Sequence, residues 1–401
     1  MPRSGWAGQL TASRRRCDVA TVTHPLSGRH ARVAEALATA GLDALVVVNS
    51  SNIRYLTGFA GSAGLVVATA DRLYLLADFR YSAAVARLVR ERIAPPSVFP
   101  VSLEASAGYD RRLVDLIAAE RWPRVGFEEA HVSVQRLRTW SRMLTDAGTT
   151  ADLVGQGDVV EALRLVKDAG EVGILREAGQ LLSRVAIGVI DEVVRAGRTE
   201  LEMAADIDWR LKRAGFEKPA FETIVASGPN SALPHARPTD RRTVDGDLVV
   251  LDFGGVLRGY AVDLTRTVGI GSVGDEPRRI YQAVLEAQQA AIDAAGRPEV
   301  TTGEVDAAAR DTLARHGLDG VFGHGTGHGL GLDVHEAPRL SRRSAEVPGT
   351  DRLEAGMVFT IEPGAYVEGT GGVRIEDDVL RLEGSAALLT DVPRAWRTIP
   401  L

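Results

Sequence analysis

Two aspartates in the second half of the chain have the spacing of a charged pair on one hairpin. Asp252 ends the apolar run Asp247–Leu251, and Asp263 follows it after a glycine-rich stretch. We expect the glycines of that stretch to form the hairpin turn: Gly254, Gly255 and Gly259. Folding the hairpin would set the two carboxylates side by side, where each anion makes burial of the other more costly. A bound cation would remove both costs.

Two imidazoles share one side of a glycine-rich segment, GHGTGHGLGLDVHE, at residues 323–336. Glycine occupies every second position from 323 to 331, which disfavours a helix. In an extended segment, alternation puts the glycines on one face and His324, Thr326 and His328 on the other. The bare face would let another backbone approach closely, while the opposite face would present both imidazoles to a shared space.

Two glutamates complete the group of candidate residues. Glu362 follows the apolar run Val358–Ile361 and precedes a Pro-Gly turn. In GVRIEDD, residues 372–378, period-2 alternation puts Arg374 and Glu376 on one face. Two aspartates, two glutamates and an imidazole near strand ends suit a pair of divalent ions such as Mn²⁺. The residues alone therefore predict a di-metal hydrolase.

The motifs around these residues resemble those of the pita-bread metallopeptidases, the family of aminopeptidase P, prolidase, methionine aminopeptidase and creatinase. The ordered set that matches the family's metal ligands is Asp252, Asp263, His328, Glu362 and Glu376. The strings LDFGG, DLTRT, GHGTGHGLGLDVHE, IEPG and GVRIEDD extend the resemblance over the whole second half. In the first half, SNIRYLTGFAGSAG and LLADFRY resemble the N-terminal domain of the Xaa-Pro branch.

The resemblance implies two divalent metal ions per chain, for which we expect Mn²⁺, with Co²⁺ and Zn²⁺ as alternatives. It implies one ion bound by Asp252, Asp263 and Glu376. The other ion would be bound by Asp263, His328, Glu362 and Glu376, so that Asp263 and Glu376 bridge the pair. Four carboxylates against two divalent cations are neutral, a balance that tolerates burial.

The same resemblance assigns residues to the substrate. His235, in ALPHARP, matches a histidine near the scissile carbonyl, and His324 matches a residue that lines the proline pocket. His335, in LDVHE, matches a donor to the carbonyl oxygen or the tetrahedral intermediate. Arg374 resembles the arginine beside the bridging glutamate, and Glu362 resembles the proton shuttle to the leaving nitrogen.

The implied activity is hydrolysis of the Xaa-Pro bond at peptide N-termini, and we favour an Xaa-Pro aminopeptidase because the N-terminal domain looks compact. The alternative is an Xaa-Pro dipeptidase, a prolidase restricted to dipeptides. A more distant alternative is a non-catalytic peptide- or protein-binding module on the same fold. Methionine aminopeptidase usually lacks the large N-terminal domain, and creatinase replaces the metal ligands. The resemblance also implies a homodimer and substrates with proline in the second position.

The elements that must position these residues fall into two domains. We expect an α/β domain over residues 26–155, because strands alternate with helices. Its expected helices are Leu26–Ala40, ended by Gly41, then Tyr81–Arg92 and Arg111–Glu120. Its expected strands are Ala44–Val48, Gly64–Ala68, Arg72–Ala77 and Arg124–Phe127.

Residues 156–401 are expected to form an α+β catalytic domain with an antiparallel sheet, the pita-bread fold of the resemblance. Val159–Arg195 predicts one or two helices that join the domains. Further expected helices are Glu200–Ala214, Glu276–Ala295 and Gly303–His316. The expected strands are Leu248–Leu251, Thr265–Ile270, Val358–Ile361 and Val373–Leu382.

Composition excludes several other classes. The 401 residues are 45% hydrophobic, which is enough for a sizeable core, and the net charge of −6 gives no field that attracts nucleic acid or anionic membranes. No segment reaches the roughly 20 apolar residues of a membrane span. Cys17 stands alone, so no internal disulfide forms, and we expect a cytoplasmic protein with a disordered tail over residues 1–25.

Overall fold

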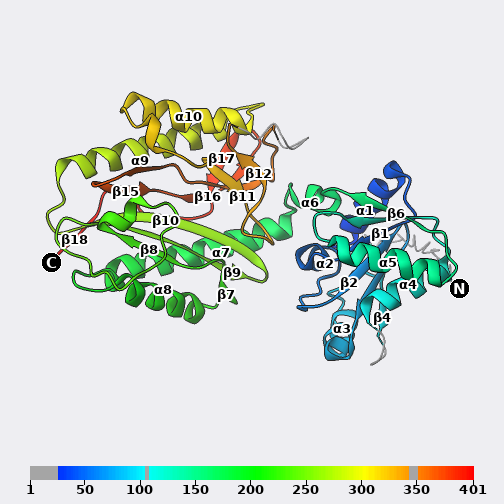
Figure 1. Ribbon diagram of the computed structural model, residues 1–401. Coiled ribbons are helices and arrows are strands. Elements are labelled where there is room, and N and C mark those ends of the chain that lie inside the picture. The colour runs from blue at the N-terminus through cyan, green and yellow to red at the C-terminus, as the bar shows by residue number, and fades with distance from the viewer. Residues whose placement is uncertain (1–25, 104–107, 343–350) are drawn as a thin grey trace, which may run out of the picture.

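The computed structural model describes residues 26–103, 108–342 and 351–401. Residues 1–25, for which the sequence predicts a disordered tail, lie outside the described residues. Figure 1 shows two parts, one from each half of the chain, with the helix α6 (Val159–Arg164) and the start of α7 (Ala169–Gly188) at the junction between them.

The N-terminal part is built on one six-stranded sheet with the order β4-β3-β2-β1-β5-β6. Its strands are β1 (Ala44–Val47), β2 (Leu65–Thr69), β3 (Leu73–Ala77), β4 (Val98–Ser102), β5 (Arg124–Glu128) and β6 (Asp152–Gln156). Its helices are α1 (Ser27–Ala40), α2 (Ser50–Thr57), η1 (Phe79–Tyr81), α3 (Ser82–Arg90), α4 (Tyr109–Glu120) and α5 (Val134–Asp146). Alternate residues of β1 belong to different apolar clusters, which lie on the two faces of the sheet. Both faces are therefore covered, as an α/β layer domain requires.

Apart from the short helix η1, four elements of this part do not follow from the sequence pattern: α2, β4, α5 and β6. Helix α5 buries only Trp140 and Leu144, so its apolar stripe is too thin to recognise. Strand β4 contains Pro100, which argues against a central strand. The structure places β4 at the edge of the sheet, where a missing backbone N–H costs no internal hydrogen bond.

The segment between the two parts forms more helical elements than the sequence predicts. The predicted helical stretch Val159–Arg195 splits into α6, α7 and a π-helical turn η2 (Val189–Val193). Helix α7 begins at a capping box, in which the Asp168 side chain accepts from the Glu171 backbone N–H and the Glu171 side chain accepts from that of Asp168. Capping satisfies backbone donors at a helix start, so it fixes where α7 begins.

The C-terminal part contains two five-stranded sheets and a separate hairpin. One sheet holds β7 (Lys218–Pro219), β8 (Ile224–Ser227), β9 (Leu248–Leu257), β10 (Tyr260–Ile270) and β18 (Thr398–Ile399). The other holds β11 (Gly327–Gly329), β12 (Glu336–Leu340), β13 (Val358–Ile361), β16 (Asp377–Leu382) and β17 (Ser385–Leu388). The hairpin is β14 (Gly364–Val367) and β15 (Gly371–Arg374), and the helices are α8 (Glu200–Ala214), η3 (Gly228–Ala232), α9 (Asp275–Ala295), α10 (Thr302–Arg315) and η4 (Asp319–Val321).

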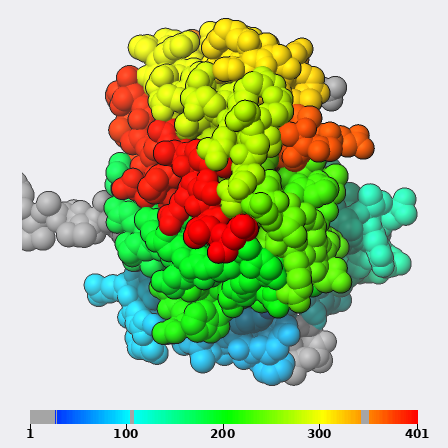
Figure 2. All heavy atoms as spheres, turned by 90° about the vertical axis from the view of Figure 1, so that its left-hand side faces the viewer, coloured from blue at the N-terminus to red at the C-terminus, as the bar shows by residue number. Residues whose placement is uncertain are grey.

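Helices enclose these strands from two sides (Figure 1). Residues of α7 and α8 pack with β9 and β10 in one apolar core, and residues of α9 and α10 pack with β13, β15 and β16 in a second. The strands pair antiparallel except for β18, which runs parallel to β10. Figure 2 shows the C-terminal residues, in red, on the face that points away from the N-terminal part.

One predicted strand is two strands in the structure. The pattern predicts Val373–Leu382 as one element, whereas β15 ends at Arg374 and β16 begins at Asp377. Between them, the Glu376 backbone N–H donates to the Thr265 carbonyl oxygen on β10 at 3.1 Å. The break lets the chain change its pairing partner at Glu376, one of the candidate ligands.

Candidate metal centre

The hairpin of β9 and β10 positions the two aspartates. Asp252 lies opposite Thr265, and Asp263 lies opposite Gly254, so both carboxylates are on one face as diagonal neighbours. The prediction that Gly254 and Gly255 form the turn is wrong, because both lie inside β9. The turn is Arg258–Gly259, with φ of 47° and 83°, the left-handed pair that a two-residue hairpin of this kind requires.

The glycine-rich strand β11 positions His328. A Cβ on Gly327 would lie 1.9 Å from the Thr360 carbonyl oxygen, and one on Gly329 would lie 2.0 Å from that of Ala337. Only glycine allows these approaches, which confirms the expectation that the bare face admits neighbouring backbone. His328 is buried on the opposite face, and its backbone N–H donates to Thr360 Oγ1 at 3.1 Å. Thr326, expected beside it, instead donates to Asp306 on α10.

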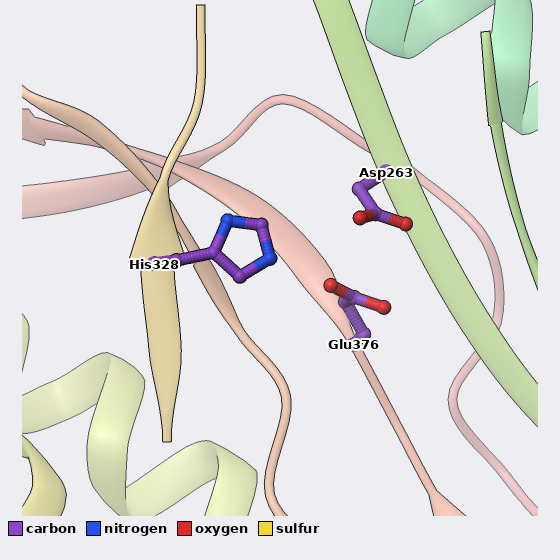
Figure 3. A group of neighbouring side chains, drawn as sticks. All are labelled: Asp263, His328 and Glu376. Carbon is purple, nitrogen blue, oxygen red and sulfur yellow. The ribbon is translucent and has the colours of Figure 1, made fainter. Parts of the chain in front are cut away.

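Three candidate ligands converge from three separate segments (Figure 3). Ligand atoms of Asp263, His328 and Glu376 all lie within 4.8 Å of one another, and all three residues are buried. Asp263 comes from β10, His328 from β11 and Glu376 from the break between β15 and β16. Nothing in local sequence brings them together, so the convergence is a property of the fold.

The other two candidate ligands lie at the edge of this cluster. Glu362 follows β13, and its Oε1 is 3.4 Å from His328 Nε2. Asp252 accepts a hydrogen bond from Arg374 Nη2 at 2.5 Å. All nine candidate site residues line one cavity of about 610 Å³: His235, Asp252, Asp263, His324, His328, His335, Glu362, Arg374 and Glu376.

Burial and mutual repulsion govern the charges of the acidic groups. Burial, followed by the charge of neighbouring carboxylates, raises the pKa of Asp263 and that of Glu376 well above the ordinary range. Burial also raises the pKa of Glu362 to about 8, although Arg374 opposes the shift. Burial lowers the pKa of His328 to about 3, so this imidazole is neutral at physiological pH. Without a cation, this cavity is a costly place for four carboxylates.

Unpartnered atoms in the cavity fit a pair of cations. Among the described residues, no hydrogen-bond partner is found for Asp252 Oδ1, Asp263 Oδ1 or Glu376 Oε1, although all three atoms are buried. His328 Nδ1 lies 3.0 Å from the Gly329 carbonyl oxygen, which can only accept, so Nε2 keeps its lone pair. Buried polar atoms are normally satisfied, and oxygen donors with one imidazole suit divalent ions.

A chain of hydrogen bonds runs from the acidic cluster to His324. Arg374 donates from Nη1 to the Tyr366 hydroxyl at 2.7 Å, and that hydroxyl lies 2.9 Å from His324 Nε2. His324 Nδ1 donates to the Gly325 carbonyl oxygen at 2.9 Å, so Nε2 accepts from Tyr366. Burial, and next the charge of Arg374, lower the pKa of His324 to about 4. His324 is therefore a neutral residue with a fixed tautomer.

Two exposed histidines stand where the cavity opens to solvent. The His335 ring lies edge-on to the His328 ring, with 4.3 Å between the ring centroids. His235 lies beside Pro234, whose carbonyl oxygen accepts from Arg374 Nη1 at 3.2 Å. Both side chains are accessible to a ligand that enters the cavity.

Residues 173–381 match the family described as Metallopeptidase family M24, a match that covers more than half of the chain and includes all five candidate ligands. The chain belongs to metallopeptidase family M24. Residues 29–166 of this M24 enzyme match the Creatinase/Prolidase N-terminal domain. The predicted family and fold class, an α/β domain followed by a pita-bread catalytic domain, are confirmed, and so is the prediction of a metallopeptidase.

Named relatives extend the match over most of the M24 peptidase. An Xaa-Pro dipeptidase from Pyrococcus horikoshii is 33% identical over 357 residues, which is 88% of this chain and 94% of that protein. The structure of an Xaa-Pro dipeptidase from Bacillus anthracis matches with a TM-score of 0.85 and 31% identity, over 93% of this chain and 100% of that one. An X-Pro aminopeptidase from Thermotoga maritima matches with a TM-score of 0.78 and 33% identity, over 90% and 98%.

No helix in the described part of the M24 peptidase is both long and apolar enough to cross a membrane.

Three side chains of the site have no signal of their own in the sequence. Thr265 donates to Glu376 Oε2 at 2.5 Å, Tyr366 joins His324 to Arg374, and Arg339 lines the cavity. Thr265 and Arg339 lie inside recognisable motifs, DLTRT and the segment after LDVHE, but only the three-dimensional pairing reveals their contacts.

Proposed function

We propose that this M24 metallopeptidase is an Xaa-Pro dipeptidase that depends on two divalent metal ions, with Mn²⁺ as the first choice. The expected aminopeptidase activity becomes the second candidate. Relatives named Xaa-Pro dipeptidase match over nearly their whole length and favour the dipeptidase, and the X-Pro aminopeptidase from Thermotoga maritima keeps the second candidate open. The observation that carries our choice is the position of Arg339.

Arg339 supplies a positive charge on the site's side of the sheet. It lies on β12 directly opposite His328 on β11, and directly opposed residues of antiparallel strands project to the same face. Arg339 lines the cavity and is exposed, and no ion pair or hydrogen bond of its side chain is found with the residues that the structure describes. A guanidinium binds a carboxylate through two parallel hydrogen bonds. A dipeptide has its C-terminal carboxylate one residue beyond the scissile bond, whereas a longer peptide has an uncharged peptide group there.

The proposed ligands are the five residues predicted from the motifs. Asp252, Asp263 and Glu376 would hold one cation, and Asp263, His328, Glu362 and Glu376 would hold the other. When bound, two divalent cations lower the pKa of a water molecule and polarise the scissile carbonyl group. The unpartnered oxygens of Asp252, Asp263 and Glu376 support this assignment.

The surrounding side chains would perform the remaining steps. His335 and His235, which are exposed and line the cavity, would donate hydrogen bonds to the substrate around its scissile carbonyl group. Glu362 would take the proton of the attacking water and deliver it to the leaving proline nitrogen, which departs only when protonated. His324, held neutral by Tyr366, would form a wall of the proline pocket. A prolyl nitrogen has no N–H in the peptide, so selection must rest on the shape of the ring.

A substrate panel tests the proposed function. Ala-Pro, Ala-Pro amide and Ala-Pro-Ala are offered to the protein with Mn²⁺, Co²⁺ and Zn²⁺ supplied in turn. We expect Ala-Pro to be cleaved with a kcat/KM about ten-fold or more above that of the amide, the range expected when an ionic hydrogen bond is lost. Faster cleavage of Ala-Pro-Ala would replace the dipeptidase with the aminopeptidase, and no cleavage of any substrate would overturn both.

We also propose that the protein works as a homodimer in the cytoplasm. The family resemblance supports the dimer, and the single cysteine is compatible with a reducing compartment. The proposed domains remain residues 26–155 and 156–401, with all five ligands in the second. Light scattering of the purified protein tests the dimer, and a mass of one chain would contradict it.

A further inference from the structure

The loop that carries His335 is attached to the N-terminal part of the protein. The segment of residues 330–336, which comprises the connection from β11 to β12 and the first residue of β12, is called here the His335 loop. Leu332 packs against apolar clusters of both parts. Asp333 and Glu336, which flank His335, point their carboxylates at the segment between the domains. The loop therefore depends on contacts with the segment that joins the two parts of the protein.

Two buried cations of that segment bind both carboxylates. Arg164 Nη2 donates to Asp333 Oδ2 at 2.7 Å and also to Glu336. Lys167 Nζ donates to Glu336 Oε1 at 2.8 Å. Arg164 is 2% exposed and Lys167 is 5% exposed. Ion pairs on the surface contribute little, but removing one member of a buried pair leaves an uncompensated charge.

Residues of α2 complete the attachment. Arg164 Nη1 donates to Asn52 Oδ1 at 2.7 Å, and Ser51 Oγ donates to Asp333 Oδ1 at 2.6 Å. Asn52 is fully buried and is itself held by Glu128 on β5, through Nδ2 to Oε1 at 2.7 Å. The His335 loop is thus connected by charged hydrogen bonds to the sheet of the N-terminal part.

The side chain of His335 has no comparable support of its own. No hydrogen bond of its ring is found among the residues that the structure describes, and its ring contact is with His328. The position of the imidazole therefore depends on the backbone of its loop. That backbone is held at its start by Ala261 on β10, whose N–H donates to the Gly331 carbonyl oxygen at 2.7 Å, and around His335 by the carboxylates of Asp333 and Glu336.

We propose that Arg164 and Lys167 are positioning residues, which hold the His335 loop against the N-terminal domain and thereby place His335 at the metal cavity. The catalytic geometry then depends on docking of a domain that contributes no metal ligand. The role of His335 in this inference rests on the proposed peptidase function, but the attachment of the loop does not. Displacing a catalytic group by about 1 Å can cost about a hundred-fold in rate.

The chain offers a matched control in Arg29. This residue is also buried, and its Nη2 donates to Asp168 Oδ2 at 2.7 Å, which links α1 to the start of α7. The pair joins the same two parts of the protein but does not contact the His335 loop. Arg29→Met should therefore remove one buried contact between the two parts while the loop stays attached, whereas Arg164→Met should release the loop.

A double-mutant cycle with His335 tests the inference through catalysis. We expect Arg164→Met to lower kcat for Ala-Pro by about ten- to hundred-fold with a much smaller change in KM, while Arg29→Met stays near wild type. In a His335→Ala background, Arg164→Met should cost at most about two-fold more, because coupled residues are not additive. An equal loss in both backgrounds would overturn the inference.

Hydrogen–deuterium exchange of the metal-free protein tests the attachment without catalysis. We expect faster exchange of backbone amides in residues 330–336 for Arg164→Met but not for Arg29→Met. Unchanged exchange in that segment would overturn the inference, even if no peptide were cleaved and the proposed function failed. If Arg164→Met does not fold, Asp333→Asn makes the same comparisons, since its side chain is 41% exposed and more tolerant of change.

Discussion

Arg374 donates a hydrogen bond to Asp252 Oδ2 at 2.5 Å, although Asp252 is a candidate metal ligand. The contact leaves Oδ1 of Asp252 without a partner among the described residues. When all four ligand carboxylates are ionised, they and Arg374 carry a net charge of −3, and two bound divalent cations would bring the total to +1. The proposed site is therefore complementary to negative charge that develops on the substrate during attack.

Arg374→Lys keeps the positive charge but removes the planar guanidinium group. The guanidinium donates from Nε to Thr265, from Nη1 to Tyr366 and from Nη2 to Asp252, and a lysine cannot reach all three. We expect kcat to fall by about ten- to hundred-fold, the usual cost of losing support around a metal site. Metal analysis should still find both ions. Wild-type kcat in this variant would contradict the role given to Arg374.

Asp263→Asn removes the proposed bridging carboxylate. We expect loss of bound metal together with a fall in activity of about a thousand-fold or more, since residues that act as a unit fail together. The metal-free variant should melt at a higher temperature than the metal-free wild type at neutral pH, because it removes a carboxyl group whose pKa is raised by folding, and such a group destabilises the folded state. Asp377→Asn is the control: Asp377 is buried and paired with Arg266 at 2.8 Å, so this variant should be less stable but retain metal. Full metal content in Asp263→Asn would refute the bridging assignment.

His324 should make stability depend on pH. Its pKa of about 4 lies below the ordinary value of 6.5, so the unfolded chain takes up a proton first as the pH falls. The contribution of neutral His324 to the free energy of unfolding is complete above pH 6.5. It is lost as the pH falls from there through the pKa of the folded state. The loss amounts to at most about 3 kcal/mol at about 1.4 kcal/mol per pKa unit.

Urea unfolding of the metal-free protein between pH 4 and pH 7 measures this effect. Relative to His324→Gln, the wild type should lose stability as the pH is lowered. A difference between the two proteins that stays constant with pH would show that His324 titrates normally in the folded state. Nitrogen-15 NMR of labelled histidine offers a second check, since His324 should remain the neutral Nδ1–H tautomer at pH 6.

Arg339→Met tests recognition of the substrate carboxylate. We expect KM for Ala-Pro to rise by about ten- to hundred-fold, while cleavage of Ala-Pro amide changes little. Arg237→Met is the matched control, because Arg237 is also an arginine that lines the cavity. Its side chain is largely exposed, and its Nε already pairs with Glu222 Oε2 at 3.5 Å. Equal effects of Arg339→Met on both substrates would rule out this recognition.

Much of the fold follows from periodicity in the sequence. Helix α8 and strand β13 have the bounds that the pattern predicts, because a strong apolar period and capping or turn residues mark their ends. Gly254 shows the limit of this reasoning. Glycine in a turn and glycine packed inside a strand look alike in a sequence, and only pairing with Asp263 distinguishes them.

The candidate metal ligands can also be predicted from the sequence, but the residues that surround and position them cannot. The candidate ligands are charged residues and a histidine at strand ends, where such residues stand out, and they lie in motifs that are specific to the family. Arg339 and Tyr366 are single residues of common types, and they matter because register and packing bring them to His328 and Arg374. Arg164 contacts Asp333 across 169 residues of chain, a distance that no local pattern spans.

The most direct test of the account is anomalous X-ray scattering from crystals of the full chain grown with Mn²⁺. We predict two peaks about 3.5–4 Å apart, both in contact with the carboxylates of Asp263 and Glu376. One peak should also contact Asp252, and the other should contact His328 and Glu362. A single peak, or peaks that avoid these side chains, would contradict the two-metal site on which the proposed peptidase rests.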